Sequence, residues 1–221
     1  MQAKRILDFL RELQKNNNRP WFQAHRAEYD ALRADFETDA RKAIERLSTV
    51  DPSVAHLTVK DVTYRFYRDT RFSPDKSPYK NHFGAYIAAH GKKALHGGYY
   101  FHLEPGHCMI ACGNYWLPTD VLTACRNKIM MQIDEFRSTV ESPAFRKYYD
   151  GFGNDKLKTA PKGFPKDFPY LEYLKAKDYC CWHYVPDDFF EGDKWLDTFA
   201  DACCAAKPMM DFVNDVIDDY E

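Results

Sequence analysis

The spacing of the apolar residues changes twice along this chain of 221 residues. Apolar side chains recur at helical spacing over residues 6–47, alternate with polar ones over 59–112, and return to helical spacing over 121–136. Further along, residues 179–185 have the pattern of another strand, and 195–219 that of another helix. Strands that are grouped together and flanked by helices are typical of an α+β fold.

We therefore predict an antiparallel sheet, made from residues near 58–115 and 178–185, that is packed by N-terminal, middle and C-terminal helices. Asn18 is expected to cap one long second helix, and Pro208 is expected to kink or split the last helix. Neither an internal repeat nor a linker interrupts the pattern, so we predict a single domain over residues 1–221.

The most specific local prediction is a hairpin around Pro105-Gly106, a pair that suits the centre of a type II turn. This turn places Leu103 opposite Cys108 and Phe101 opposite Ile110. Strand alternation then assigns each side chain to one of two faces. The core face holds Tyr99, Phe101, Leu103, Cys108, Ile110 and Cys112, and the outer face holds Tyr100, His102, Glu104, His107 and Met109.

Composition restricts the class of protein more than its function. A hydrophobic content of 45% is ample for the core of a soluble globular protein, and no apolar run approaches the ~18 residues of a membrane span. Seven cysteines without a Cys-x-x-Cys spacing indicate reduced core thiols, so we expect a cytoplasmic protein that is not bound to membranes. A pI near 6.4 argues against generic nucleic-acid binding, for which a domain pI above ~9 is usual.

Residues 65–80 hold the densest chemistry in the chain. The five cations of this segment outnumber its carboxylates, Asp69 and Asp75, by three (5 − 2), whereas the formal net charge of the whole chain is −2. Such an excess predicts a site for an anion, such as a phosphorylated small molecule or a nucleotide. We also predict a strand over 64–72, on which Arg65 and Arg71 share one polar face.

We expect the ligand-binding side chains to come from this segment and from the second helix. They are Trp21, Arg26, Arg65, Arg68, Asp69, Arg71, Lys76, Tyr79 and Lys80. In this hypothesis the anion is contacted by Arg65, Arg71, Lys76 and Lys80, while Asp69 and Tyr79 orient these cations. For Trp21, a role as a hydrophobic anchor against the core is the favoured alternative.

The same residues resemble a known family. Asn17, Trp21-Phe22 and the Arg26-x-x-Tyr29 spacing, followed by the two halves of the 65–80 segment, are similar to the family called domain of unknown function 2461. The first half is Arg-Asp-Thr-Arg-Phe-Ser and the second is Asp-Lys-Ser-Pro-Tyr-Lys. The resemblance extends over the whole chain and implies a fold and a motif, but no reaction.

Three functional hypotheses follow from the segment. The favoured one is a binding domain for a phosphorylated or other anionic ligand. The second is an enzyme that acts on an anionic, phosphate-containing substrate, with Asp69 or Asp75 as the base. The third is an interaction or scaffold protein, in which the motif is an internal network of ion pairs. The residues identify no cofactor and no oligomeric state.

A weaker candidate site lies on the outer face of the hairpin. His102, Glu104 and His107 are residue types that ligate divalent metals, and the last two are neighbours across the turn. Histidines near hairpin ends are usually solvated, and the chain contains no His-Glu-x-x-His motif. We therefore predict no metal site.

Overall fold

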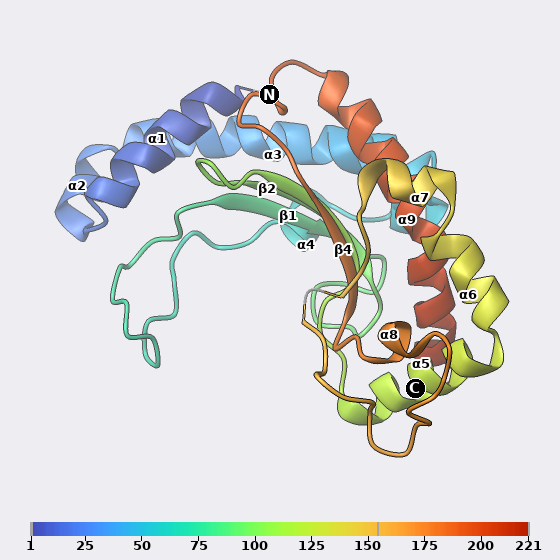
Figure 1. The fold of residues 1–221 in the computed structure, drawn as a ribbon. Helices are drawn as coiled ribbons and strands as arrows, with labels where there is room; N and C mark the ends of the chain where they lie inside the picture. Colours follow the sequence, from blue (N-terminus) through green and yellow to red (C-terminus); the bar gives the residue numbers. More distant parts are fainter. Residues whose placement is uncertain (1, 154, 221) are drawn as a thin grey trace. The chain divides into compact units, whose positions relative to one another are not determined.

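The computed structural model describes residues 2–153 and 155–220 (Figure 1). Four strands form one sheet in the order β1-β2-β3-β4: β1 Phe83–Ile87, β2 Gly98–Leu103, β3 Met109–Asn114 and β4 Tyr179–Tyr184. The helices are α1 Ala3–Lys15, α2 Arg19–Ala24, α3 Arg26–Ser48, α4 Val59–Val62, α5 Thr119–Met131, α6 Ile133–Val140, α7 Pro143–Tyr148, α8 Leu171–Leu174 and α9 Lys194–Asp218, with a 3-10 turn at Pro52–Val54. The sheet is antiparallel and is accompanied by helices, so the α+β prediction is confirmed.

The chain forms two compact units, each assembled from three separate stretches of sequence. Unit 1 comprises Met1–Lys92, Tyr100–Ile110 and Tyr184–Ala200, and unit 2 comprises Lys93–Tyr99, Ala111–His183 and Asp201–Glu221. The single domain over residues 1–221 stays a prediction. None of the described helices combines the length and the apolar character that crossing a membrane requires.

The core of unit 1 lies where α1 and α3 run along one face of β1 and β2 (Figure 1). Phe36 of α3 packs against both strands, with ring centroids 5.3 Å from Phe83 and 5.6 Å from Phe101. The ring of Phe101 also lies 5.2 Å from that of Trp195, at the start of α9. Burial of these large rings supplies much of the apolar contact that stabilises the unit.

The predicted hairpin is confirmed at its turn and on its core face. The His107 amide donates to the Glu104 carbonyl over 2.9 Å, and Gly106 has φ +75°, as the third position of a type II turn requires. All six predicted core-face side chains are buried. The extents of two helices differ from the prediction. The long second helix is interrupted at His25, which separates α2 from α3. The last helix, α9, continues through Pro208 and is not split there.

Asn18 caps α2 as predicted, with its side-chain oxygen accepting from the Trp21 amide over 3.0 Å. In unit 2, Gly113 has φ +115°, and a Cβ there would lie 2.1 Å from the Tyr179 carbonyl oxygen, so only glycine allows β4 to approach β3 at this point. The seven cysteines are all free thiols, and only Cys204 is exposed.

Candidate functional site

The 65–80 segment is a narrow loop and not the predicted strand. Its two sides are joined at the base by hydrogen bonds from the Arg68 amide to the Pro78 carbonyl (3.0 Å) and from the Lys80 amide to the Phe66 carbonyl (2.9 Å). Beyond this base the chain leaves extended geometry and projects away from β1 (Figure 1). The prediction of a strand over 64–72 is wrong, because Asp69 and Asp75 each accept from a backbone amide two residues ahead and so favour turns.

We call Phe66, Tyr67 and Tyr79 the foot of this segment. The rings of Phe66 and Tyr79 are buried, at 5.9 and 4.0 Å from the ring of Phe22 on α2. The side-chain amide of Asn17 bonds to the backbone of Tyr79. It donates to the Tyr79 carbonyl over 3.0 Å and accepts from the Tyr79 N–H over 3.1 Å. Tyr79 is therefore a packing residue of the foot, and its role in orienting cations around a ligand stays a prediction.

We call residues 68–77 the tip. Arg71 donates to Asp69 over 2.7 and 3.0 Å, and Arg68 donates to Asp75. Hydrogen bonds from Ser77 and Arg68 lower the pKa of Asp75 to about 2, and those from Arg71 lower the pKa of Asp69. These cations and carboxylates are arranged to satisfy one another.

The remaining tip residues follow the same pattern. Lys76 donates to the carbonyl of Thr70 over 2.9 Å, within the loop. Phe72, which an alternating strand would place on the side of Phe66, is 93% exposed, and the Arg71 guanidinium lies 5.8 Å from its ring. The tip thus stabilises its own conformation without pairing its charges to the rest of unit 1 among the described contacts.

Trp21 and Arg26 also have partners close by. Trp21 stacks on His25 with ring centroids 4.0 Å apart, and lies 5.6 Å from Phe9 of α1. Arg26 donates to both oxygens of Asp30, at 2.9 and 3.0 Å. The packing of Trp21 agrees with its alternative role as a hydrophobic anchor.

The last two cations of the predicted set, Arg65 and Lys80, lie at a second group of charges. We call Arg33, Tyr64, Arg65, Lys80 and Lys92 the Tyr64 cluster. Lys80 Nζ lies 4.9 Å and Lys92 Nζ 5.3 Å from the centre of the Tyr64 ring, and Arg33 donates to the Tyr64 carbonyl over 3.0 Å. Sequence reasoning missed Arg33 and Lys92, which come from α3 and from the turn after β1.

The charges of the Tyr64 cluster are only partly balanced. Arg33 pairs with Glu37 at 2.6 Å, and Lys92 donates to the Thr63 carbonyl over 2.7 Å. In the part of the chain that the structure describes, the side chains of Arg65 and Lys80 form no hydrogen bond and no ion pair, although the charge of Arg65 acts on Asp69 of the tip. Burial and the positive charges of Arg65 and Arg33 lower the pKa of Lys80.

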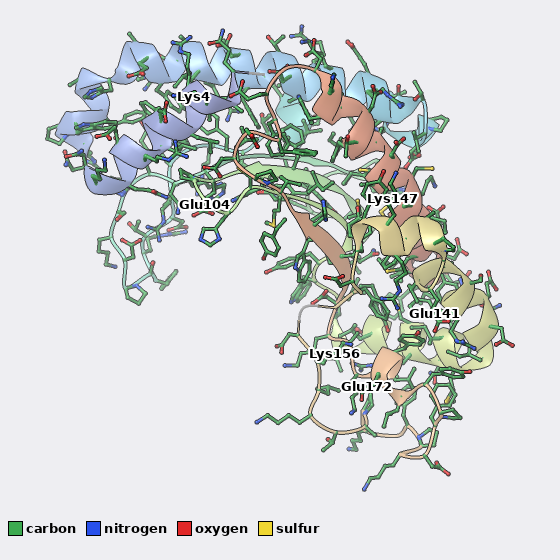
Figure 2. The ribbon with its side chains drawn as sticks, turned by 45° about the horizontal axis from the view of Figure 1, so that its top comes forward. Lys4, Glu104, Glu141, Lys147, Lys156 and Glu172 are labelled. Carbon is green, nitrogen blue, oxygen red and sulfur yellow. The ribbon has the colours of Figure 1, made fainter. Side chains whose placement is uncertain are left out.

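A hydrogen-bonded chain of side chains occupies the other face of β2. His102 contacts Tyr100 Oη through Nδ1 (2.7 Å) and Glu104 Oε2 through Nε2 (3.0 Å), and Asn81 donates to Glu104 Oε1 over 2.5 Å. Figure 2 labels Glu104 at the hairpin end of β2. His102 is buried, so the expectation that it is solvated is wrong, because Tyr100 and Glu104 satisfy both of its nitrogens.

His82 joins this chain and was missed from the sequence. Its ring centroid lies 4.5 Å from that of His102. His82, His102 and Glu104 each offer one potential ligand atom, and these three atoms lie within 4.8 Å of one another. The set therefore contains His82, and not the His107 considered from the sequence, which is exposed. The antiparallel pairing of β1 with β2 could have predicted this neighbourhood. It places His82, just before the start of β1, beside His102 near the end of β2.

The surroundings hold these imidazoles in their neutral form. Burial, His102 and Lys80 lower the pKa of His82 to about 3, and burial lowers the pKa of His102 against the opposing effect of Glu104. Burial also raises the pKa of Tyr100. The ring of Tyr100 fits across β1 because residue 84 is glycine, where a Cβ would lie 2.4 Å from the Tyr100 hydroxyl oxygen.

Comparison with known proteins places the chain in a family. A family model described as "Conserved hypothetical protein (DUF2461)" matches residues 5–212. The chain belongs to this family, as its motifs predict. The matched range includes the foot, the tip, the Tyr64 cluster and the side chains around His102. No curated protein and no solved structure matches the chain.

Proposed function

We propose that unit 1 binds a phosphorylated or otherwise anionic small molecule at the Tyr64 cluster. The observation that carries this proposal is the position of Lys80, half-buried beside Arg65 and Arg33 with no carboxylate paired to it in the described chain. Removing an ammonium group from water and placing it near other cations is unfavourable unless an anion compensates. A phosphate group supplies that compensation.

The aromatic ring of the cluster supports a ligand that carries more than charge. Tyr64 lies under two ammonium groups and is itself 37% exposed, so it offers a flat apolar surface beside the cations. A nucleotide or a sugar phosphate combines these two chemistries, whereas the pI near 6.4 still argues against generic nucleic-acid binding. The proposed ligand class is therefore a phosphorylated small molecule.

A specific observation favours an enzyme as the second candidate. The Tyr100, His102 and Glu104 side chains form a hydrogen-bonded chain, and Lys80 of the Tyr64 cluster acts electrostatically on the adjoining His82. Such a chain can move a proton to or from a ligand bound beside it. Asp69 and Asp75, which the sequence suggested as bases, are instead engaged with Arg71 and with Ser77 and Arg68.

The test is a thermal-shift titration with inorganic phosphate, a nucleoside monophosphate and a hexose phosphate, at constant ionic strength. A ligand that binds only the folded state stabilises it by about 2.7 kcal/mol at a concentration of 100 Kd. We expect a saturable rise in Tm for the parent protein, and its loss in Lys80→Ala and Arg65→Ala.

Arg71→Ala is the matched control, because it removes a cation from the tip and leaves the Tyr64 cluster intact. We expect this variant to keep the full shift. Loss of the shift in Arg71→Ala but not in Lys80→Ala would transfer the site to the tip. A parent protein that shows no saturable shift with any of the three anions would contradict the proposal.

The free thiols support a reducing compartment. All seven cysteines are unpaired, and burial raises the pKa of Cys108 to about 11 and that of Cys125 to about 12, which keeps them protonated and unreactive at neutral pH. We accordingly include a cytoplasmic location in the proposal.

A further inference from the structure

We propose that His82, His102 and Glu104 bind a divalent transition-metal ion, independently of the anion site. Each residue offers one ligand atom, and the three atoms lie within 4.8 Å of one another. Ligand atoms around a tetrahedral zinc ion are roughly 3.5 Å apart, so small side-chain rotations bring all three within bonding distance. Two imidazole nitrogens and one carboxylate oxygen suit zinc and its neighbours better than calcium or magnesium.

The residues behind these ligands are oriented as a metal site requires. Asn81 donates to Glu104 Oε1, so its own carbonyl oxygen is directed to His82 Nδ1 at 3.2 Å. His82 must then carry its proton on Nδ1, which leaves the lone pair of Nε2 available for coordination. A single amide thereby fixes both a carboxylate and an imidazole, as outer partners do in metal sites.

His102 can coordinate without gaining or losing a proton overall. With Glu104 ionised, His102 Nε2–H donates to the carboxylate and Nδ1 accepts from the Tyr100 hydroxyl. Coordination through Nε2 moves the imidazole proton to Nδ1, which then donates to Tyr100. The tyrosine turns from donor to acceptor, and Glu104 exchanges its hydrogen bond for a bond to the ion.

The alternative explanation is that these side chains form a purely structural hydrogen-bond network. The position of His82 distinguishes a metal site from such a network. Tyr100, His102, Glu104 and Asn81 satisfy one another without His82 Nε2, for which the described residues provide no hydrogen bond. A purely structural network has no use for a second imidazole 4.5 Å from the first. A metal site requires it as the third ligand.

The experiment measures Zn²⁺ binding by calorimetry and Co²⁺ binding by absorption, on the full chain after treatment with a chelator. All proteins carry Cys204→Ser, because this exposed thiol is a competing metal ligand. We expect one ion per chain and a Co²⁺ spectrum with visible bands but no strong thiolate band in the near ultraviolet. His82→Ala should weaken binding more than 100-fold, and Asn81→Ala by 10–100-fold, as for other outer-partner substitutions.

His107→Ala is the matched control, since it removes an imidazole from the same hairpin without touching the three ligands. It should bind both ions as the parent does. Far-ultraviolet circular dichroism and Tm identify any variant that fails to fold, and His82→Gln replaces His82→Ala in that case. Absence of stoichiometric binding in the folded parent would overturn the proposal, as would equal weakening by His82→Ala and His107→Ala.

Discussion

The tip and the Tyr64 cluster are both rich in cations, but they differ in how those charges are balanced. At the tip, Arg71 pairs with Asp69 and Arg68 with Asp75, so that two guanidinium groups face two carboxylates. At the Tyr64 cluster, the charged groups that act on Lys80 are the cations Arg65 and Arg33. The guanidinium groups of the tip are thus paired within the tip, whereas Lys80 has only cations among the charged groups that act on it.

The two regions also differ in burial. The Arg71 side chain is 76% exposed, and an ion pair in water contributes little to stability. Lys80 is half-buried, where solvent compensates its charge less well. The number of cations therefore does not distinguish the two regions, whereas the balance and the solvation of each cation do.

The largest expected effect is on the free energy of unfolding, and it distinguishes the buried foot from the exposed tip. Phe66→Ala removes a buried ring that packs on Tyr29 at 4.7 Å and on Phe22, so we expect the free energy of unfolding to fall by about 3–5 kcal/mol. Phe72→Ala removes an exposed ring and should change it by less than about 0.5 kcal/mol. Urea denaturation of the two variants measures both, and similar losses would show that the tip is packed in solution.

The hairpin was predictable because two independent signals agree. Turn chemistry at Pro105-Gly106 and the alternation from Tyr99 to Cys112 demand the same register, and the buried side chains follow it. The alternation over 64–72 has no such support. Its partner residues, Pro78 to Lys80, are too few for a ladder, and Asp69 and Asp75 favour turns on either side.

The membership of the proposed anion site was predictable only in part, because its residues come from elements that are distant in the sequence. Arg65 and Lys80 belong to the motif and were predicted. Arg33 reaches the Tyr64 carbonyl from α3, and Lys92 comes from the turn after β1, so no local spacing connects them to the motif. Burial of His102 likewise depends on Tyr100 and on the neighbouring strand, which a pattern of alternating residues does not specify.

A prediction of intermediate size concerns the pairing of Arg71 with Asp69. It tests whether this pairing is what would keep the tip from binding phosphate. Asp69→Asn leaves the Arg71 guanidinium without its carboxylate, so the tip should acquire a weak response to phosphate. Because Arg71 is exposed, we expect this stabilisation to be much smaller than that from the Tyr64 cluster and to add to it. The double variant Asp69→Asn with Lys80→Ala isolates this new response in the same thermal-shift assay. A response of the double variant as large as that of the parent would show that phosphate binding does not require Lys80 of the Tyr64 cluster.

The smallest expected effect is the titration of Asp75, whose pKa of about 2 lies below the ordinary value of 3.8. Because the folded-state pKa is the lower one, the bonds from Ser77 and Arg68 stabilise the tip above pH 3.8, and this contribution is lost as the pH falls towards 2. At about pH 3 an ordinary aspartate is mostly protonated. Asp75 should then still be mostly ionised, as its carboxyl carbon shift in NMR would report. Ser77→Ala removes the largest cause of the shift and should move the midpoint back towards 3.8. A midpoint near 3.8 in the parent protein would mean that the tip is open in solution, and Arg68 would then lack a carboxylate partner, as Lys80 does.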